Sequence, residues 1–159
     1  MPMHSIHTPL TSVSTVAEYP LGVTFERINP STQSEEVWIY VFNDEASASF
    51  VIGTIVMRKD GTATGHDSVI ATTSCAIARI QGVAQHTIVA QSYGWIQRRG
   101  IAEVLADTGG LTANTGIIPG NAVAGRADDA SAVTVATFGF ATETVAGTAL
   151  ATCYINCLG

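Results

Sequence analysis

The sequence predicts an all-β fold: a compact β-sandwich or barrel of about ten short strands, preceded by an extended N-terminal arm. Three observations support this prediction. Short apolar stretches alternate between two faces with a period of two residues. Turns rich in glycine and threonine separate these stretches. No segment keeps the helical period of an amphipathic helix. The chain of 159 residues is long enough for one domain with its own core.

The N-terminal segment differs in composition from the rest of the chain. Residues 1–20 are rich in serine, threonine and proline, and they hold no strand or helix period. Such a segment is expected to be an extended arm that is ordered only against a neighbour. We therefore divide the chain into an arm over 1–20 and a single β domain over 21–159.

The first two strands of the domain are expected on either side of a loop. Residues 21–28 alternate apolar and polar positions, which is typical of a half-buried strand. Residues 29–36 carry turn-forming residues and predict a loop. The stretch 37–42 has two apolar faces, one with Val37, Ile39 and Val41 and the other with Trp38, Tyr40 and Phe42. A strand of this kind lies in a core, or between its own domain and a partner.

Three further strands are expected over 49–58, 68–73 and 75–84. Gly53 interrupts the first of them and predicts a bulge or a close approach of another segment. Asp60-Gly61 predicts a turn.

The longest run with strand alternation covers residues 84–107. On an extended backbone, one side of this run carries Tyr93, Trp95, Gln97 and Arg99. Gly100 interrupts the alternation, so we predict two β segments that are bent at this glycine.

The C-terminal part is expected to contain more loop. We predict a loop over 108–125, which contains a turn at 117–120 and a short strand at 121–124, and then a turn at 126–131. A strand over 132–142, kinked at Gly139, is expected to follow. After a loop over 143–148, a closing strand is expected over 149–158.

Composition restricts the classes of partner. Charged residues make up 13% of the chain and apolar residues 47%, whereas about a quarter of a typical domain is charged. A surface this poor in charge suits a protein that buries much of itself against partners, or a β domain with a Thr/Ser surface. The net charge of −6, with a single lysine, argues against nucleic-acid binding. No apolar stretch is long enough for a membrane span, and no signal peptide is recognised, so we expect a soluble protein made in the cytoplasm.

The three cysteines do not predict a disulfide. Cys153 and Cys157 would lie on one face of a strand, about 13 Å apart, which is too far for a bridge. Cys75 has no evident partner, and the spacing is not that of a zinc site. We expect buried free thiols.

No catalytic, cofactor or metal site is expected. Neither a nucleophile elbow nor a phosphate-binding loop is present. His66 and His86 belong to no signature, and His4 and His7 lack further ligands nearby. The chain is therefore predicted not to be an enzyme. Tyr93 and Trp95 beside Gln97 and Arg99 would suit a carbohydrate- or peptide-binding face if exposed; otherwise they are core or subunit-interface residues.

A series of motifs over about 120 residues carries a family resemblance. In chain order they are VWIYVFN, GTIVMRKDGT, ARIQGVAQHTIVAQSYGWIQRRGIAEVLAD, IIPGNAVAGRADDA and FGFATETVAGTALATCYINCL. In this order they resemble the small capsid decoration (cement) proteins of tailed bacteriophages. The first 20 residues and the three cysteines have no counterpart in that pattern.

The resemblance implies a non-enzymatic protein of the virion. It would bind the major capsid protein on the outer surface of the icosahedral head, as a homotrimer, and stabilise the shell. The arm over 1–20 would lie across the capsid or a neighbouring copy. The candidate interface residues are Trp38, Tyr40, Phe42, Tyr93, Trp95, Arg98 and Arg99. Alternatives are a β-sandwich carbohydrate- or peptide-binding module and another minor virion protein, such as a head-fibre base or tail component.

Overall fold

The computed structural model describes residues 2–3, 6–59, 66–132 and 136–157, and it confirms the all-β prediction. Twelve strands form one continuous sheet, and the helical content of the described residues is a single 3-10 turn, η1 (Ile77–Arg79). The strands are β1 (Pro2–Met3), β2 (Val13–Ser14), β3 (Thr24–Ile28), β4 (Glu35–Asn43), β5 (Ile55–Arg58), β6 (Asp67–Ile70), β7 (Ile80–Val83), β8 (Ser92–Leu105), β9 (Gly116–Pro119), β10 (Ala127–Asp129), β11 (Gly139–Ala141) and β12 (Leu150–Asn156). No described helix is long and apolar enough to cross a membrane.

Five of these strands close into a barrel. The order is β4-β6-β5-β7-β8, and β8 pairs back with β4. Only the β4–β6 pair is parallel among these neighbours. The barrel interior is filled by aliphatic side chains and one phenylalanine: Ile39, Val41, Phe50, Val56, Ala84, Ile88 and Ile96. Closure leaves the barrel strands with few free edges, which protects them from unwanted pairing.

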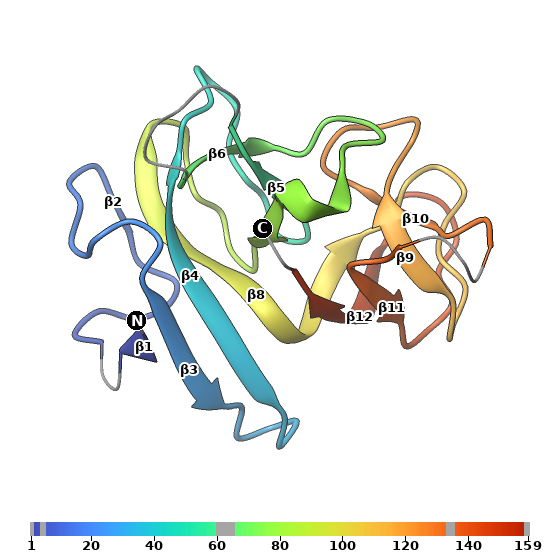
Figure 1. Cartoon of the computed structure of the whole chain (residues 1–159), viewed down its shortest axis with the longest axis horizontal. Coiled ribbons are helices and arrows are strands. Elements are labelled where there is room, and N and C mark those ends of the chain that lie inside the picture. Colours follow the sequence, from blue (N-terminus) through green and yellow to red (C-terminus); the bar gives the residue numbers. More distant parts are fainter. Residues whose placement is uncertain (1, 4–5, 60–65, 133–135, 158–159) are drawn as a thin grey trace.

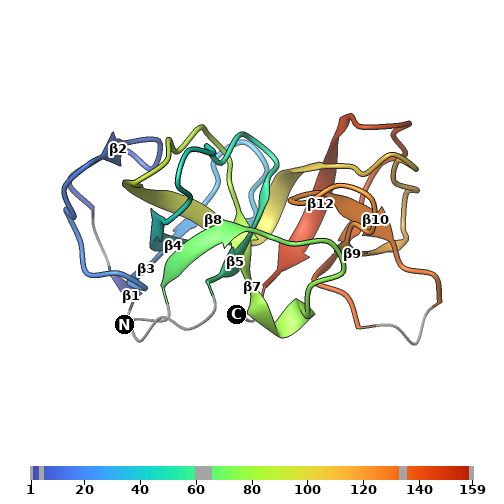
Figure 2. The same ribbon diagram turned by 90° about the horizontal axis from the view of Figure 1, so that it is seen from above.

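Strand β8 belongs to two parts of the molecule. Its first half pairs with β4, and its second half pairs with β12 from Arg99 to Leu105. Beyond β8 the same sheet continues in the order β12-β11-β9-β10, and we call this part, together with the second half of β8, the second sheet. A parallel bridge between Ala106 and Ala127 brings the end of β8 next to β10. Figures 1 and 2 show β8 running from the barrel into this second sheet.

The bend in β8 lies at Gly100, as the sequence suggested, but the strand continues through it. Gly100 has φ of 108°, and a β-carbon at this position would collide with the carbonyl oxygen of Glu35. Only glycine meets both conditions without strain. One long bent strand therefore replaces the two predicted segments.

The N-terminal segment packs on the chain's own sheet. Leu10 and Tyr19 are buried against the outer face of β4 and β8. The Tyr19 hydroxyl accepts hydrogen bonds from the amides of His7 (2.9 Å) and Thr8 (3.1 Å). In addition, β1 pairs with β3 and β2 with β8. The segment expected to be an extended arm thus lies against the barrel, because the aromatic face of the barrel supplies an apolar surface for it.

A third apolar cluster joins the barrel to the second sheet. Ile55, Met57 and Ile80 from the outside of the barrel pack against the inner face of the second sheet. That inner face includes Val104, Ala151, Cys153 and Ile155. The two halves of the molecule therefore share a core.

Three predictions for the C-terminal part are wrong. The predicted turn at 117–120 is largely strand β9, the predicted strand at 121–124 is a loop, and the predicted turn at 126–131 contains strand β10. The Asp107 carboxylate accepts hydrogen bonds from the amides of Ala122 and Val123, at 2.8 and 3.2 Å, which holds this loop in place. Gly116, Pro119 and the aspartates of β10 have low strand propensity, and they form strands here because neighbouring strands pair with them.

Other boundaries are shorter or shifted. The expected strand over 49–58 begins at Ile55, since Gly53 with φ of 83° turns the chain just before it. The strand over 75–84 starts with η1, and β4 already begins at Glu35 within the predicted loop. Strand β11 is three residues long, and part of the predicted 132–142 strand lies outside the described residues. The predicted Asp60-Gly61 turn and His4 also lie outside them.

Candidate interaction surfaces

Three of the predicted interface residues are core residues. Trp38, Tyr40 and Trp95 are exposed by 5%, 2% and 0%. The Trp95 ring lies 5.1 Å from that of Tyr40 and 5.3 Å from that of Tyr19, measured between centroids. The N-terminal segment covers this face, so these side chains offer no surface to a partner while the segment is in place. For Trp95, the core alternative is the one that the structure supports.

The other predicted residues lie nearer the surface. Phe42 and Tyr93 are half-buried, with ring centroids 4.7 Å apart. The Arg98 Nε donates a hydrogen bond to the carbonyl of Cys157 at 3.1 Å. Arg99 is exposed and lies in the second half of β8. The structure thus gathers the predicted aromatic residues into one cluster and leaves Arg98 and Arg99 outside it.

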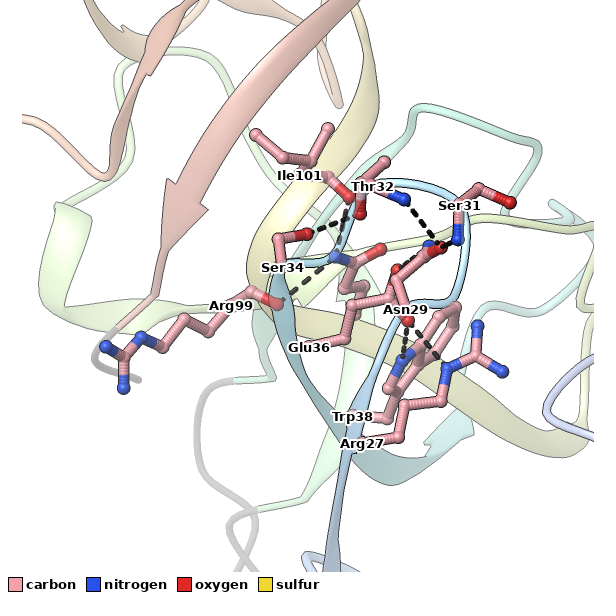
Figure 3. A network of polar contacts seen from close by, with 10 residues as sticks. Arg27, Asn29, Ser31, Thr32, Ser34, Glu36, Trp38, Arg99 and Ile101 are labelled. Atoms are coloured by element: carbon pink, nitrogen blue, oxygen red, sulfur yellow. Dashed lines mark hydrogen bonds and ion pairs between the residues drawn. The ribbon is translucent and has the colours of Figure 1, made fainter.

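A network of polar side chains fixes the β3–β4 hairpin (Figure 3). At its centre, the buried carboxylate of Glu36 accepts hydrogen bonds from Arg27 Nε (2.7 Å), Asn29 Nδ2 (2.5 Å) and Trp38 Nε1 (3.1 Å). The Arg27 guanidinium lies 5.6 Å from the centroid of the Trp38 ring, close enough for a cation–π interaction. Asn29 also accepts a hydrogen bond from the amide of Ser31, which ties the hairpin loop to the network.

The environment of Glu36 favours its charged form. Burial alone would raise the pKa of this carboxyl, but hydrogen bonds from Asn29, Arg27 and Trp38, with the charge of Arg27, lower it below its ordinary 4.5. A cleft of about 290 Å³ lies beside Glu36 and reaches Gln97 and Glu103. Because the carboxylate is already held by three donors, it is suited to holding the hairpin and not to transferring protons.

Burial shifts the pKa of two thiols and two imidazoles in the described structure. Burial raises the pKa of the free thiols of Cys153 and Cys157 to about 12, so they are poor nucleophiles at neutral pH. Burial also lowers the pKa of His66 and of His86, which favours their neutral forms. Within the described part of the chain, no group of three or more His, Cys, Asp or Glu side chains is arranged to hold a metal ion.

Exposed apolar side chains lie around Gly53, where the barrel adjoins the second sheet. Val51 and Ile52 are 45% and 41% exposed, and Leu150 is 37% exposed. Gly53 brings them together, because its carbonyl accepts a hydrogen bond from the Leu105 amide at 2.9 Å and its α-carbon lies against the Leu150 side chain. We call Val51, Ile52, Leu105 and Leu150 the apolar corner. Clustered exposed apolar residues commonly mark interaction sites.

Sequence reasoning missed the apolar corner. It placed Val51 and Ile52 inside a strand, where one of two neighbouring residues would be buried. The one available signal was Gly53, for which a close approach of another segment was expected. That expectation is confirmed, since Gly53 contacts Leu105 and Leu150.

Comparison with known proteins gives a likeness of fold. No protein-family model matches the chain, and no curated protein matches its sequence. Among solved structures, the chain is similar to the head fiber gp8.5 N base in bacteriophage phi29, with a TM-score of 0.53. The match covers 76% of this chain and 94% of that chain, at 13% sequence identity. At this identity, the likeness shows a shared fold.

Proposed function

We propose that this chain is a structural protein of a bacteriophage virion that binds the outer surface of the head. The observation that carries the proposal is the likeness to a phage head-fibre base, which extends over 94% of that chain. The resemblance of the sequence motifs to capsid decoration proteins also supports a structural role in the virion. In this proposal the partner is the major capsid protein, and the chain stabilises contacts between its copies.

The chemistry of the chain supports a role without catalysis. The hydroxyl of Tyr19 and the carboxylate of Glu36 are both engaged in holding the fold together. The thiols of Cys153 and Cys157 are kept protonated by burial. We therefore infer a binding protein, with no enzymatic activity and no cofactor.

The apolar corner is the surface that best suits attachment to the shell. The backbone beneath it is held in place, because the Gly53 amide donates a hydrogen bond to the Ala84 carbonyl at 2.7 Å and the Gly53 carbonyl accepts one from Leu105. Burial of such side chains contributes about 25 cal/mol per Å² of apolar surface. A homotrimer would present three such corners at once, and linked contacts raise the overall affinity well above that of a single one.

Reconstitution on phage heads tests the proposal. Heads assembled without this chain are mixed with the purified protein, and bound protein is measured after sedimentation. We expect saturable binding, and density for the chain on the outside of the head by electron cryo-microscopy. Absence of binding, or a position in the tail, would overturn the proposal. The same map distinguishes a decoration protein from a fibre base.

A matched pair of variants tests the surface. Ile52→Asp places a charge in the apolar corner, whereas Ile28→Asp places the same charge on β3, where Ile28 is 62% exposed. We expect Ile52→Asp to weaken head binding by at least about tenfold and Ile28→Asp to leave it unchanged. Equal binding by both variants would assign attachment to another surface.

A further inference from the structure

A row of side chains crosses the outer face of the second sheet. In the strand register, Gly116 of β9 faces Phe140 of β11, Phe140 faces Tyr154 of β12, and Tyr154 faces Ile101 of β8. The Phe140 and Tyr154 rings are stacked, with centroids 5.5 Å apart and planes at 25°. We call Phe140 and Tyr154 the aromatic shelf.

The aromatic shelf faces outward. In β12, Ala151, Cys153 and Ile155 point into the core, so Tyr154 points to the opposite side. Phe140 remains 44% exposed. At the end of the row, Gly116 has no side chain, and a β-carbon there would meet the methyl group of Thr137. The shelf therefore borders an open cleft of about 310 Å³, at the lower end of ligand-binding volumes.

Polar side chains flank the shelf on both sides. On one side Asn156 pairs in register with Arg99, whose Nε donates a hydrogen bond to the Tyr154 hydroxyl at 3.3 Å. On the other side, the Thr152 hydroxyl lies 3.3 Å from the Glu103 carboxylate. The apolar surface is thus one row wide and lies between hydroxyl, amide and charged groups.

This arrangement suits a sugar ring better than a protein surface. Aromatic faces carry partial negative charge and attract the C–H bonds on one face of a pyranose, while amide, hydroxyl and carboxylate groups hydrogen-bond to its hydroxyls. A stable protein interface needs a much broader apolar centre, with about 800 Å² buried on each partner. We propose that the aromatic shelf binds a hexopyranose unit of a glycan. This proposal is independent of attachment to a phage head.

The charges around the shelf indicate which glycans it accepts. Arg99 forms an ion pair with Glu35, with 3.4 Å between Nη1 and Oε1. The Glu103 carboxylate lies beside the Thr152 hydroxyl, and the Glu143 carboxylate accepts a hydrogen bond from the Thr152 amide. The excess of carboxylates disfavours anionic sugars through like-charge repulsion. The shelf is therefore selective for neutral hexoses over sulfated or uronic acid glycans.

Titration with defined sugars tests the proposal. Trisaccharides of glucose, galactose and mannose, together with a glucuronic acid trisaccharide, are added to the isotopically labelled chain and followed by NMR. We expect at least one neutral trisaccharide to shift signals of Phe140, Tyr154 and Asn156, and the acidic one to shift none. Binding of none of the neutral sugars, or shifts confined to other residues, would overturn it.

Two substitutions at one position separate stacking from simple apolar contact. Phe140→Tyr keeps the ring, and Phe140→Leu keeps an apolar side chain without the ring. We expect Phe140→Tyr to bind within about threefold of the native chain and Phe140→Leu to bind about tenfold more weakly, at an unchanged thermal midpoint. Unchanged sugar binding by Phe140→Leu would overturn the proposal, as would a change in oligomeric state, which would assign the shelf to a contact between copies.

Discussion

The barrel and the second sheet, which share β8, each contain a cross-strand aromatic pair, but one pair is buried and the other is partly exposed. In the barrel, Trp95 of β8 faces Tyr40 of β4 in register, and both side chains are buried. In the second sheet, Phe140 faces Tyr154 in the same cross-strand manner, and Phe140 stays exposed. The difference is the N-terminal segment, which covers the first pair and lies at the other end of the molecule from β12 (Figure 2).

This contrast shows that the segment packed over an aromatic pair, and not the residue types of its strands, decides whether the two rings are buried or exposed. A covered pair contributes its buried area to folding, whereas an exposed pair retains surface for a ligand or partner. The barrel pair is therefore expected to determine stability. The pair in the second sheet is expected to affect binding with little effect on stability.

The largest expected effect comes from removing the covered ring. Trp95→Ala should lower the free energy of unfolding by about 3–5 kcal/mol, because it leaves a cavity among aromatic side chains. Phe140→Ala, the matched change in the exposed pair, should lower it by less than about 1 kcal/mol. Urea denaturation of both variants measures the difference. Similar losses would contradict the contrast between the two pairs.

The next largest effect is expected where β8 passes from one half to the other. Gly100→Ala should cost about 2–3 kcal/mol, because an alanine at φ of 108° is strained and its methyl group would meet the Glu35 carbonyl. Gly147→Ala is the control, since Gly147 also has positive φ, at 57°, but has open space around its α-carbon. The control should cost clearly less in the same denaturation assay.

The network around Glu36 is expected to make a contribution to the free energy of unfolding that depends on pH. Glu36→Gln should lower the free energy of unfolding by about 2 kcal/mol at pH 7, because the donors from Arg27 and Asn29 lose a charged acceptor. The folded-state pKa of Glu36 lies below its ordinary 4.5. The stabilisation by the charged carboxylate is therefore complete above pH 4.5, the ordinary pKa, and it is lost as the pH falls through the folded-state pKa.

Unfolding curves at several pH values check this expectation. The difference between the native chain and Glu36→Gln should shrink as the solution becomes more acidic than pH 4.5, the ordinary pKa of this carboxyl. A difference that grows on acidification would show that the network does not favour the charged carboxylate.

The smallest effects on stability are expected from removing single tyrosine hydroxyl groups. Tyr19→Phe should cost about 1–2 kcal/mol, because it leaves the amides of His7 and Thr8 without their acceptor. Tyr154→Phe removes a hydroxyl at the exposed shelf and should change stability by less than about 0.5 kcal/mol. Thermal unfolding of both variants tests whether the cover over the barrel depends on the Tyr19 hydroxyl. Equal effects would show that it does not.

The alternation of side chains was predictable from the sequence, because strand geometry alone sets it. Ile39 and Val41 were expected on one face of a strand and Trp38 and Tyr40 on the other, and the structure confirms both faces. Free thiols at Cys153 and Cys157, the bend at Gly100 and the close approach at Gly53 were also expected from local geometry.

The position of the N-terminal segment was not predictable in the same way. Its serines, threonines and prolines have no strand period, so only the apolar face beneath Leu10 and Tyr19 decides where the segment lies. Strands β9 and β10 were missed for a related reason. The glycine and proline of β9 and the aspartates of β10 have weak strand propensity, and the two strands are held by partners distant in sequence, such as Ala106 and β11.

By itself, the sequence determined the fold class, the two faces of β4 and the glycine at the bend of β8, because these depend on residue type and a period of two. Tertiary structure alone decided how the strands close, which aromatic pair is covered and which residues approach Gly53. Those features depend on contacts between residues far apart in the chain, and no local pattern encodes such contacts.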